Sequence, residues 1–160
     1  NLGFALQNRG ALFSLDPQHL NCLQPGKRPF HTIIPAMVTQ NGRPVFVFGV
    51  MGGDMQPQGH AQVLMNWIDF GMNIQMAGDA ARIRHDGSAT PTGIPEEESG
   101  GTVFTESGIP ADTVEALKAK GHQPSSGGSY GGYQGILIDW ERGILHGATE
   151  ARKDGAALGY

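Results

Sequence analysis

The feature that most constrains this chain is a strand-like run that breaks at two consecutive glycines and gives way to a helical pattern. Residues 44–51 are rich in β-branched and aromatic side chains, which is typical of a strand buried on both faces. From residue 58 to residue 70 the apolar side chains recur at helical spacing. Those expected on one face are Ala61, Leu64, Met65 and Ile68, with Trp67 beside them. Gly52 and Gly53 therefore lie where a strand leads into a helix.

Two glycines at this junction allow the backbone to take up positive φ angles and to come within contact distance of a ligand. Their N–H groups, together with those of the first helical turn, are suited to bind negative charge. The ligand could be a phosphate, a carboxylate or the oxyanion of an acyl-transfer intermediate. The alternative interpretation is a tight turn between two packed elements, with no ligand.

Length and charge limit the class of protein. The chain has 160 residues, and we interpret residues 1–160 as a single partial domain, because the sequence begins within a strand-like segment. The formal net charge is −4 and the Lys and Arg residues are scattered, which argues against a nucleic-acid partner. No apolar run is long enough to cross a membrane. The single cysteine, Cys22, has no partner for an internal disulfide.

The remaining segments alternate between strand and helix signals. Strands are expected over residues 2–7, 30–39, 102–105 (an edge strand), 133–139 and 144–148, the last two as a hairpin. Asn41–Gly42 is a strong hairpin signal between residues 30–39 and the central strand. Further helices are expected over residues 75–84 and over a segment that residues 109–112 open and Gly121 ends, and polar or glycine-rich loops over residues 86–101 and 125–132. Antiparallel strand pairs with grouped helices predict an α+β sandwich.

The side chains themselves supply no nucleophile. None of the six histidines has metal-ligand spacing to another, so we expect no metal and no cofactor. A Lys-Ser/Thr pair does not follow the glycines, and no Gly-x-Ser-x-Gly elbow is present. His31 and Arg152 are interpreted from the residues alone as structural. The residues alone therefore predict an anion-binding turn and nothing further.

Five motifs occur in an order that resembles the γ-glutamyltransferase family. They are Pro-Gly-Lys-Arg-Pro at 25–29, Gly-Val-Met-Gly-Gly at 49–53, Asp-Ala-Ala-Arg at 79–82, Gly-Tyr-Gln-Gly-Ile at 132–136, and the C-terminal segment from Gly147 through Arg152 to Tyr160. The resemblance extends over essentially the whole chain. It is to the later part of the small, catalytic subunit.

The resemblance implies an N-terminal-nucleophile hydrolase with a four-layer αββα sandwich, of which this chain is a part. Such proteins are made as one precursor that cuts itself into two subunits, and the new N-terminal Thr of the small subunit is the nucleophile. That Thr is not in this chain. The implied partners are the large subunit, the upstream part of the small subunit and a γ-glutamyl or related amide. The implied compartment is periplasmic or extracellular. Gly52 and Gly53 would form the oxyanion hole.

Substrate-binding positions match the family less closely. Serines that help to hold the substrate α-carboxylate are replaced by His31 and Thr32. An acidic residue that holds the α-ammonium corresponds to Leu12, and its polar companion corresponds to Arg9. We therefore expect Arg9, His31 and Thr32 to bind substrate, and the recognition of a free amino group to be altered.

The resemblance favours an enzyme that cleaves γ-glutamyl amides such as glutathione. One alternative is an acylase of the same fold that acts on another amide, such as a cephalosporin-type side chain. A second alternative, from another class, is a non-catalytic homologue that serves as a binding subunit. The residue directly after the maturation cut would distinguish these, because Thr there supports an enzyme and any residue other than Thr, Ser or Cys supports the non-catalytic homologue.

Overall fold

The computed structural model describes residues 3, 6–87 and 101–160, which divide into two compact units. The first unit contains residues 1–33 and 87–101, and the second contains residues 34–86 and 102–160. The second unit carries both sheets and all three α-helices found in the described ranges.

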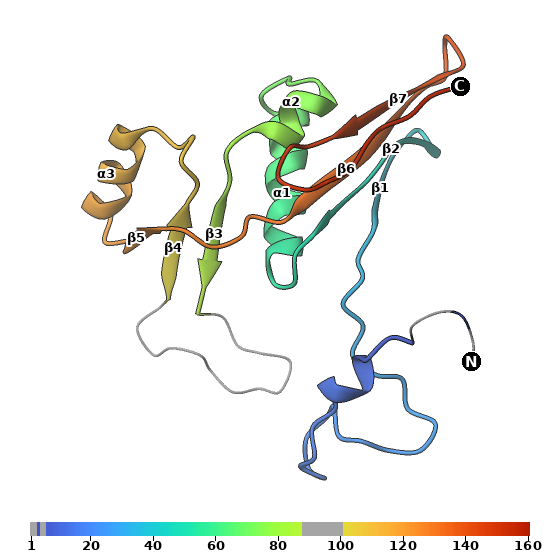
Figure 1. The fold of residues 1–160 in the computed structure, drawn as a ribbon, viewed down its shortest axis with the longest axis vertical. Coiled ribbons are helices and arrows are strands. Elements are labelled where there is room, and N and C mark those ends of the chain that lie inside the picture. Colours follow the sequence, from blue (N-terminus) through green and yellow to red (C-terminus); the bar gives the residue numbers. More distant parts are fainter. Residues whose placement is uncertain (1–2, 4–5, 88–100) are drawn as a thin grey trace. The chain divides into compact units, whose positions relative to one another are not determined.

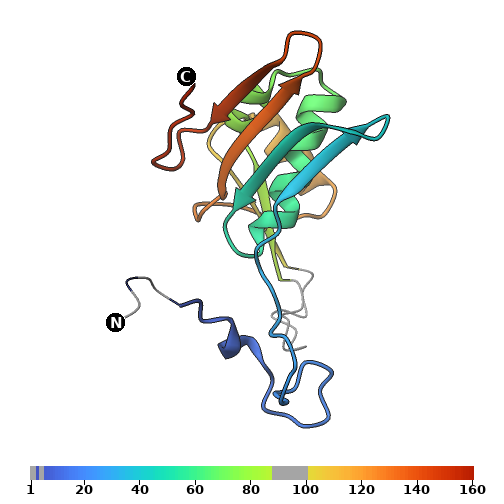
Figure 2. The same ribbon diagram turned by 90° about the vertical axis from the view of Figure 1, so that its right-hand side faces the viewer.

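The main sheet of the second unit has four antiparallel strands in the order β1-β2-β6-β7. The strands are β1 (Ala36–Gln40), β2 (Arg43–Met51), β6 (Gly132–Asp139) and β7 (Ile144–Thr149). Helices α1 (Met55–Ile68) and α2 (Ile74–Asp79) pack on one face of this sheet, as Figures 1 and 2 show. The helical layer therefore begins directly where β2 ends.

A smaller sheet of three strands completes the second unit. β4 (Thr102–Thr105) lies in its centre, antiparallel to β3 (Ile83–Asp86) and parallel to β5 (Pro124–Ser126). Helix α3 (Ala111–Ala119) connects β4 to β5 (Figure 1). Gly121, with a φ of +88°, follows this helix, as a glycine that ends a helix commonly does.

The first unit has little regular structure in its described part. It contains one 3₁₀ helix, η1 (Arg9–Leu12), and a bridge between Ser14 and Cys22. Cys22 is buried and its thiol is free, as the sequence requires.

The core lies between the main sheet and helices α1 and α2. Alternate residues of β2, Phe46, Phe48 and Val50, point into it, and the first two rings stack with centroids 4.7 Å apart. They meet Val63 of α1 and Ile74 of α2. Every second residue of the central strand is thus buried against the helices, which is the period of a pleated strand.

Glutamine side chains attach the helices to the edges of strands. The amide of Gln62 donates to the carbonyl of Ile83 and accepts from its N–H, at 3.0 and 2.8 Å. Gln58 makes the same pair with His85, and Gln75 makes it with Thr149 on β7. Each glutamine therefore occupies backbone groups that an open strand edge would leave unpaired.

Several sequence predictions are confirmed. The Asn41–Gly42 turn joins β1 to β2, with φ angles of +52° and +77°. The central strand ends at the two glycines, and the closing hairpin is β6 and β7. The α+β class is confirmed as well.

Other predictions are wrong in their bounds or in the face they bury. Residues 30–35 are outside β1, which begins at Ala36 because Pro35 cannot donate to a ladder. The helix predicted over residues 75–84 ends at Asp79, and β3 begins within that range. The strand at residues 102–105 is central, not an edge, because β5 pairs with it. On α1 the buried residues are Met55, Gly59 and Val63, whereas Met65 and Ile68 are exposed.

Two further predictions concern residues outside the described ranges. The strand expected over residues 2–7 includes residues 2, 4 and 5, and of its described members Leu6 and Gln7 are in no strand. Most of the polar loop expected over residues 86–101 falls on residues 88–100, which also lie outside the described ranges.

Candidate functional site

The junction between β2 and α1 is built from two glycines with positive φ angles. Gly52 has a φ of +136° and Gly53 a φ of +60°. A φ of +136° is essentially restricted to glycine, because a β-carbon would collide with the backbone. Both residues are exposed in this chain. The backbone thus leaves the strand by a conformation that only this residue type adopts readily.

The N–H groups of Gly52 and Gly53 have no hydrogen-bond acceptor among the described residues. Their carbonyls are used, since Gly52 accepts from the Met55 N–H at 3.2 Å and Gly53 accepts from the Gln56 N–H at 3.0 Å. The first-turn donors of α1 that the sequence assigned to anion binding are therefore occupied. The N–H of Asp54 likewise has no acceptor among the described residues, so the donors that remain at the turn are those of Gly52, Gly53 and Asp54.

Asp54, at the N-cap of α1, is exposed and its carboxylate makes no capping hydrogen bond. A carboxylate at a helix N-terminus is favoured by the helix dipole. The Asp54 carboxylate would also repel an anion bound at this turn, because the two charges have the same sign.

A second polar cluster, at the far end of β7, is of a different kind. Arg152 donates Nε and Nη2 to the two carboxylate oxygens of Glu106, at 2.7 and 2.6 Å, and Nη1 to Glu150. Its remaining N–H groups reach backbone carbonyls at the end of α2, those of Gly78, Asp79 and Ala80. A guanidinium has five N–H donors, and all are occupied here. The structural role predicted for Arg152 is confirmed.

Arg82 lies beside this cluster and is almost fully buried. It pairs with Glu150 at 2.8 Å, and the two side chains are 1% and 0% exposed. It also donates to the carbonyls of Tyr130 and Gly78, each at 2.8 Å. Buried charges are costly unless paired and hydrogen-bonded, and this pair makes these contacts, while the Arg82 Nε and the Glu150 Oε1 are buried without a partner among the described residues. We refer to Arg82, Glu106, Glu150 and Arg152 as the arginine–carboxylate cluster.

The cluster shifts the pKa values of its members. Burial lowers the pKa of Arg82, and the neighbouring Arg152 lowers it further against the opposing effect of Glu150. Burial acts to raise the pKa of Glu106, but hydrogen bonds from Arg152 and from the Arg82 N–H outweigh it, so the pKa is below its ordinary value. The carboxylate of Glu106 is thus held ionised at neutral pH.

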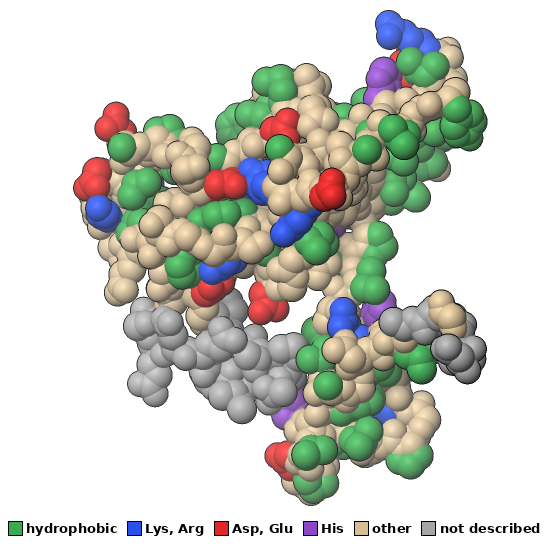
Figure 3. All heavy atoms as spheres, in the orientation of Figure 1, with side chains coloured by type: hydrophobic (Ala, Val, Ile, Leu, Met, Phe, Trp, Pro, Cys, Tyr) green, Lys and Arg blue, Asp and Glu red, His purple; other side chains and the backbone are tan. Residues whose placement is uncertain are grey.

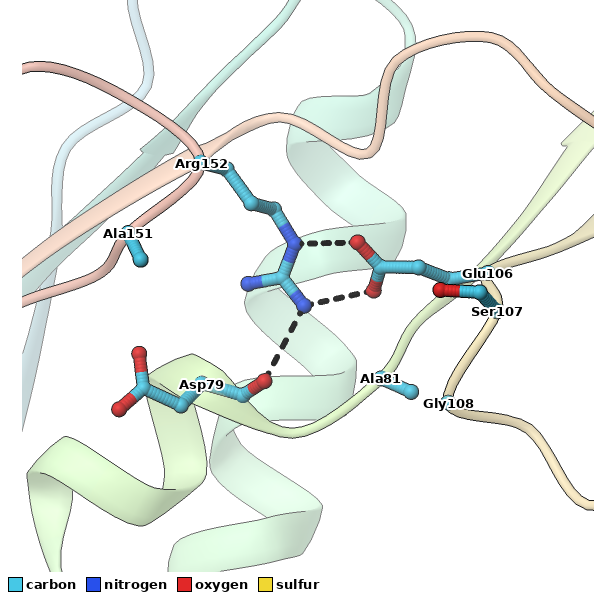
Figure 4. A pocket seen from close by; sticks show the side chains of 7 residues that line it. All are labelled: Asp79, Ala81, Glu106, Ser107, Gly108, Ala151 and Arg152. Carbon is cyan, nitrogen blue, oxygen red and sulfur yellow. Dashed lines mark hydrogen bonds and ion pairs between the residues drawn. The ribbon is translucent and has the colours of Figure 1, made fainter.

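A shallow hollow of about 530 Å³ lies against this cluster. Figure 4 shows Arg152 reaching across to Glu106 and to the backbone carbonyl of Asp79. The lining residues are Asp79, Ala81, Glu106, Ser107, Gly108, Ala151 and Arg152. They include one hydroxyl, Ser107, and no histidine or lysine to activate it. Neither Gly52 nor Gly53 lines this hollow.

The residues expected to bind substrate all lie in the first unit. Arg9 begins η1, which also contains Leu12, and its Nη1 donates to the side chain of Asn8 at 2.9 Å. His31 is exposed, and Thr32 is partly buried. Both follow the Lys-Arg-Pro segment outside any strand. The two glycines belong to the second unit.

Sequence reasoning missed Arg82 and Glu150, although both lie in motifs that it used. Asp-Ala-Ala-Arg contains Arg82, and the C-terminal motif contains Glu150 next to Arg152. Two arginines in separate motifs, with an acidic residue beside one of them, are a signal for a paired cluster. The partner Glu106 carries no such signal, because only the fold of β4 brings it there.

The described residues give no sign of a metal centre or a membrane span. Within these ranges no three His, Cys, Asp or Glu side chains gather so that they could hold an ion. None of the described helices combines the length and the apolar composition needed to cross a bilayer. On the face seen in Figure 3, Lys and Arg side chains are dispersed among acidic and apolar ones.

Comparison with known proteins gives a consistent result over the whole chain. The family model of gamma-glutamyltranspeptidase matches residues 1–160. Among curated proteins, the glutathione hydrolase-like YwrD proenzyme of Bacillus subtilis is 38% identical over 98% of this chain and 29% of its own length. The oxamate amidohydrolase proenzyme of Klebsiella pneumoniae is 37% identical over 99% of this chain and 29% of its own length.

A solved structure agrees with these relatives. The cephalosporin acylase from Bacillus halodurans superposes with a TM-score of 0.79 and 45% identity, over 99% of this chain and 28% of that one. The fold is therefore of the N-terminal-nucleophile hydrolase type, as the resemblance implied. The chain spans less than a third of the length of the curated relatives it matches.

Proposed function

Because the chain belongs to the gamma-glutamyltranspeptidase family, we propose that it is part of an amide-cleaving acyltransferase or amidohydrolase and supplies the oxyanion hole. The observation that carries this proposal is the pair of N–H groups at Gly52 and Gly53, which have no acceptor among the described residues. Donors aimed at the position where negative charge develops are the main electrostatic device of acyl transfer.

The proposed reaction uses a nucleophile that this chain does not contain. The hydroxyl of an upstream N-terminal Thr attacks the amide carbonyl carbon, and its proton passes to the Thr α-amino group. The carbonyl oxygen becomes an oxyanion, which accepts from the N–H groups of Gly52 and Gly53. When the tetrahedral intermediate collapses, the C–N bond breaks and the amine leaves with that proton. Water, or an acceptor amine, then releases the acyl group from the Thr.

A single-atom replacement tests the donor role. In the complete mature protein, glycolic acid in place of Gly53 converts the peptide to an ester and deletes the N–H without adding a side chain. Loss of one oxyanion donor is expected to lower kcat by about 10²–10³-fold. Proline would delete the same N–H, but it cannot adopt the φ of +60° found at Gly53.

The matched control is Gly53→Ala, which keeps the N–H. A β-carbon at Gly53 would meet nothing within 4 Å, so the substitution adds only the cost of a positive φ. We expect this variant to retain kcat within about tenfold, since that cost is roughly 1–2 kcal/mol. An ester variant with the kcat of the parent would refute the oxyanion hole.

Three observations favour an acylase, the second candidate, over a strict γ-glutamyl enzyme. An unpaired ammonium costs several kcal/mol to bury, and Leu12 offers it no acceptor. Arg9, at the other end of η1 from Leu12, has a buried Nε with no partner among the described residues and would repel an ammonium while attracting a carboxylate. The relatives named above include a cephalosporin acylase and an oxamate amidohydrolase. We propose acyl groups that present a carboxylate or a masked amine, bound by Arg9, His31 and Thr32.

This substrate proposal predicts poor turnover of γ-glutamyl anilides with a free amine, relative to their N-acetyl forms. The double variant Arg9→Gln, Leu12→Asp should restore part of the activity on the free amine, because it removes a cation and adds an anion. The measurement is kcat/KM for both substrates in parent and variant. A parent that prefers the free amine tenfold, about 1.4 kcal/mol, would contradict the proposal.

The open face of the main sheet is where we propose that the rest of the precursor packs. Met37, Ile136 and Leu145 point away from α1 and α2 and are 59%, 44% and 67% exposed. A sheet with one covered face and one apolar face is half of a sheet-on-sheet packing. The proposed occupants are the upstream part of the small subunit and the large subunit. A monomeric chain of residues 1–160 with a sharp, cooperative melt would argue against this.

A further inference from the structure

Gly131, which is far from the Gly52–Gly53 turn in sequence, contacts the backbone of that turn. A β-carbon built on Gly131 would lie 2.6 Å from the carbonyl oxygen of Met51 and 2.7 Å from Cγ1 of Val50. A β-carbon built on Gly52 would in turn lie 2.9 Å from the Cα of Gly131. The two backbones are therefore in direct contact, and neither position has space for a side chain.

The contacted carbonyl belongs to the peptide that carries the Gly52 N–H. In a trans peptide the C=O and N–H groups lie in one plane and point in opposite directions. Gly131 thus contacts the carbonyl side of the Met51–Gly52 peptide, whereas the Gly52 N–H on the opposite side of that peptide points away from Gly131. The orientation of the Gly52 N–H depends on how closely residue 131 approaches Met51.

The alternative, that Val50 would yield instead, is blocked by a second glycine. Val50 is buried, and a β-carbon built on Gly59 of α1 would lie 2.6 Å from its Cγ1. The Cγ1 of Val50 is thus enclosed between the backbones of Gly59 and Gly131. Because packed cores do not deform freely, bulk added at 131 must displace the Met51 peptide.

Gly131 is itself held in place by the arginines of the second unit. Arg82 donates to the carbonyl of Tyr130, directly before Gly131, and Arg84 donates to that of Ser129 at 3.1 Å. The Arg82 bond is buried, and its guanidinium is fixed by Glu150. The arginine–carboxylate cluster therefore anchors the loop that supports the turn.

On the basis of these contacts, and resting on the proposed oxyanion hole, we propose that Gly131 is a positioning residue that sets the direction of the Gly52 N–H. It touches no substrate and acts only through the Met51–Gly52 peptide. A β-carbon at residue 131 would rotate that peptide and misalign the donor, leaving the rest of the site in place.

The test compares Gly131→Ala with Gly127→Ala in the complete mature protein. Both glycines have positive φ angles, +80° and +100°, but a β-carbon at Gly127 would meet nothing within 4 Å. The pair therefore separates the cost of the conformation from the contact with the turn. We expect Gly131→Ala to lower kcat by about 10–100-fold, with KM changed by less than about twofold. This is less than the roughly 10²–10³-fold for a lost oxyanion donor, because the donor is misaligned and not removed. Gly127→Ala should stay within about threefold of the parent in both.

A binding measurement distinguishes misaligned donors from general damage. A boronic-acid analogue of the acyl group forms a tetrahedral anionic adduct with the nucleophile, whereas the free acid product is planar. Gly131→Ala should lose affinity for the boronate in proportion to kcat and keep its affinity for the product. Equal losses for both ligands, or no loss relative to Gly127→Ala, would overturn the proposal.

A second variant guards against failure to fold. Gly131→Asn adds the same β-carbon, and Asn adopts positive φ more readily than Ala. If Ala and Asn at 131 both prevent folding while the same changes at 127 do not, the contact serves the fold and the positioning role is wrong. The ester at Gly53 separates the two hypotheses. An ester of normal activity refutes the oxyanion hole, whereas an impaired ester beside a normal Gly131→Ala refutes only the positioning role.

Discussion

The second unit contains two polar regions that differ in how their donors are used. In the arginine–carboxylate cluster every N–H of Arg152 has an acceptor, and the Arg82–Glu150 pair is sealed from solvent. At the Gly52–Gly53 turn the backbone donors have no acceptor among the described residues, and the turn is exposed. Saturated donors stabilise a fold, whereas donors left open at a strand–helix junction are available to a ligand. The more highly charged region is therefore the structural one.

The comparison is tested most strongly by breaking the arginine–carboxylate cluster. Arg82→Met, in the complete protein, removes the buried partner of Glu150 and the donors to two backbone carbonyls. We expect a loss of roughly 3–5 kcal/mol in the free energy of unfolding, because the buried Glu150 carboxylate loses one of its two arginine partners and two buried carbonyls lose their donor. Denaturant titration measures it, and Arg142→Met is the control, since the Arg142 side chain is 75% exposed. Equal stability of the two variants would show that the cluster is not structural.

A smaller effect is expected at Glu106, where it depends on pH. Glu106→Gln removes the negative charge that Arg152 grips and should cost about 1.5–3 kcal/mol at pH 7. The pKa of Glu106 is lowered in the folded state, so the stabilisation is complete above the ordinary pKa of about 4.3 and disappears as pH falls through the lowered value. The stabilities of parent and variant, measured by thermal melting from pH 7 to 3, should converge at the acid end. A constant difference across that range would contradict this assignment.

The smallest effect is expected at Tyr133, which has a hydroxyl without a partner, like the turn, but is buried, like the arginine–carboxylate cluster. The Tyr133 hydroxyl is buried without a partner among the described residues, and burial raises its pKa. It is enclosed by Gly78 and Gly135, where β-carbons would lie 2.2 and 2.1 Å from the tyrosine side chain. A donor without a partner is thus not a ligand site when it is buried where no ligand can reach it.

Tyr133→Phe should therefore stabilise the complete protein by about 1 kcal/mol or leave it unchanged, because an unsatisfied buried hydroxyl is removed. Thermal melting of Tyr133→Phe and of Tyr130→Phe provides the check. Tyr130→Phe is the control because the Tyr130 hydroxyl has a partner and donates to the Gly127 carbonyl at 3.1 Å. Destabilisation of Tyr133→Phe by more than that of Tyr130→Phe would indicate a partner for the Tyr133 hydroxyl.

Much of the fold could be predicted from local pattern. The Asn41–Gly42 turn and the two strand runs it joins depend on residues adjacent in sequence, so the hairpin was predictable. The face that α1 buries was not, because Gly59 is buried only through its contact with Val50. Glycines at 59, 78 and 135 carry no apolar signal, yet each lies where another side chain fills the space.

The candidate site divides in the same way. The sequence by itself determined a strand that ends in two glycines before a helix, and with the other motifs it determined the family. Tertiary structure alone decided which donors at that turn stay open, since the first-turn N–H groups of α1 bond back to Gly52 and Gly53. It also decided that Gly131 supports the turn and that Glu106 joins Arg82 and Arg152. These contacts join residues 24 to about 80 positions apart, and pairing at such distances depends on how the sheets and helices pack, which local sequence does not encode.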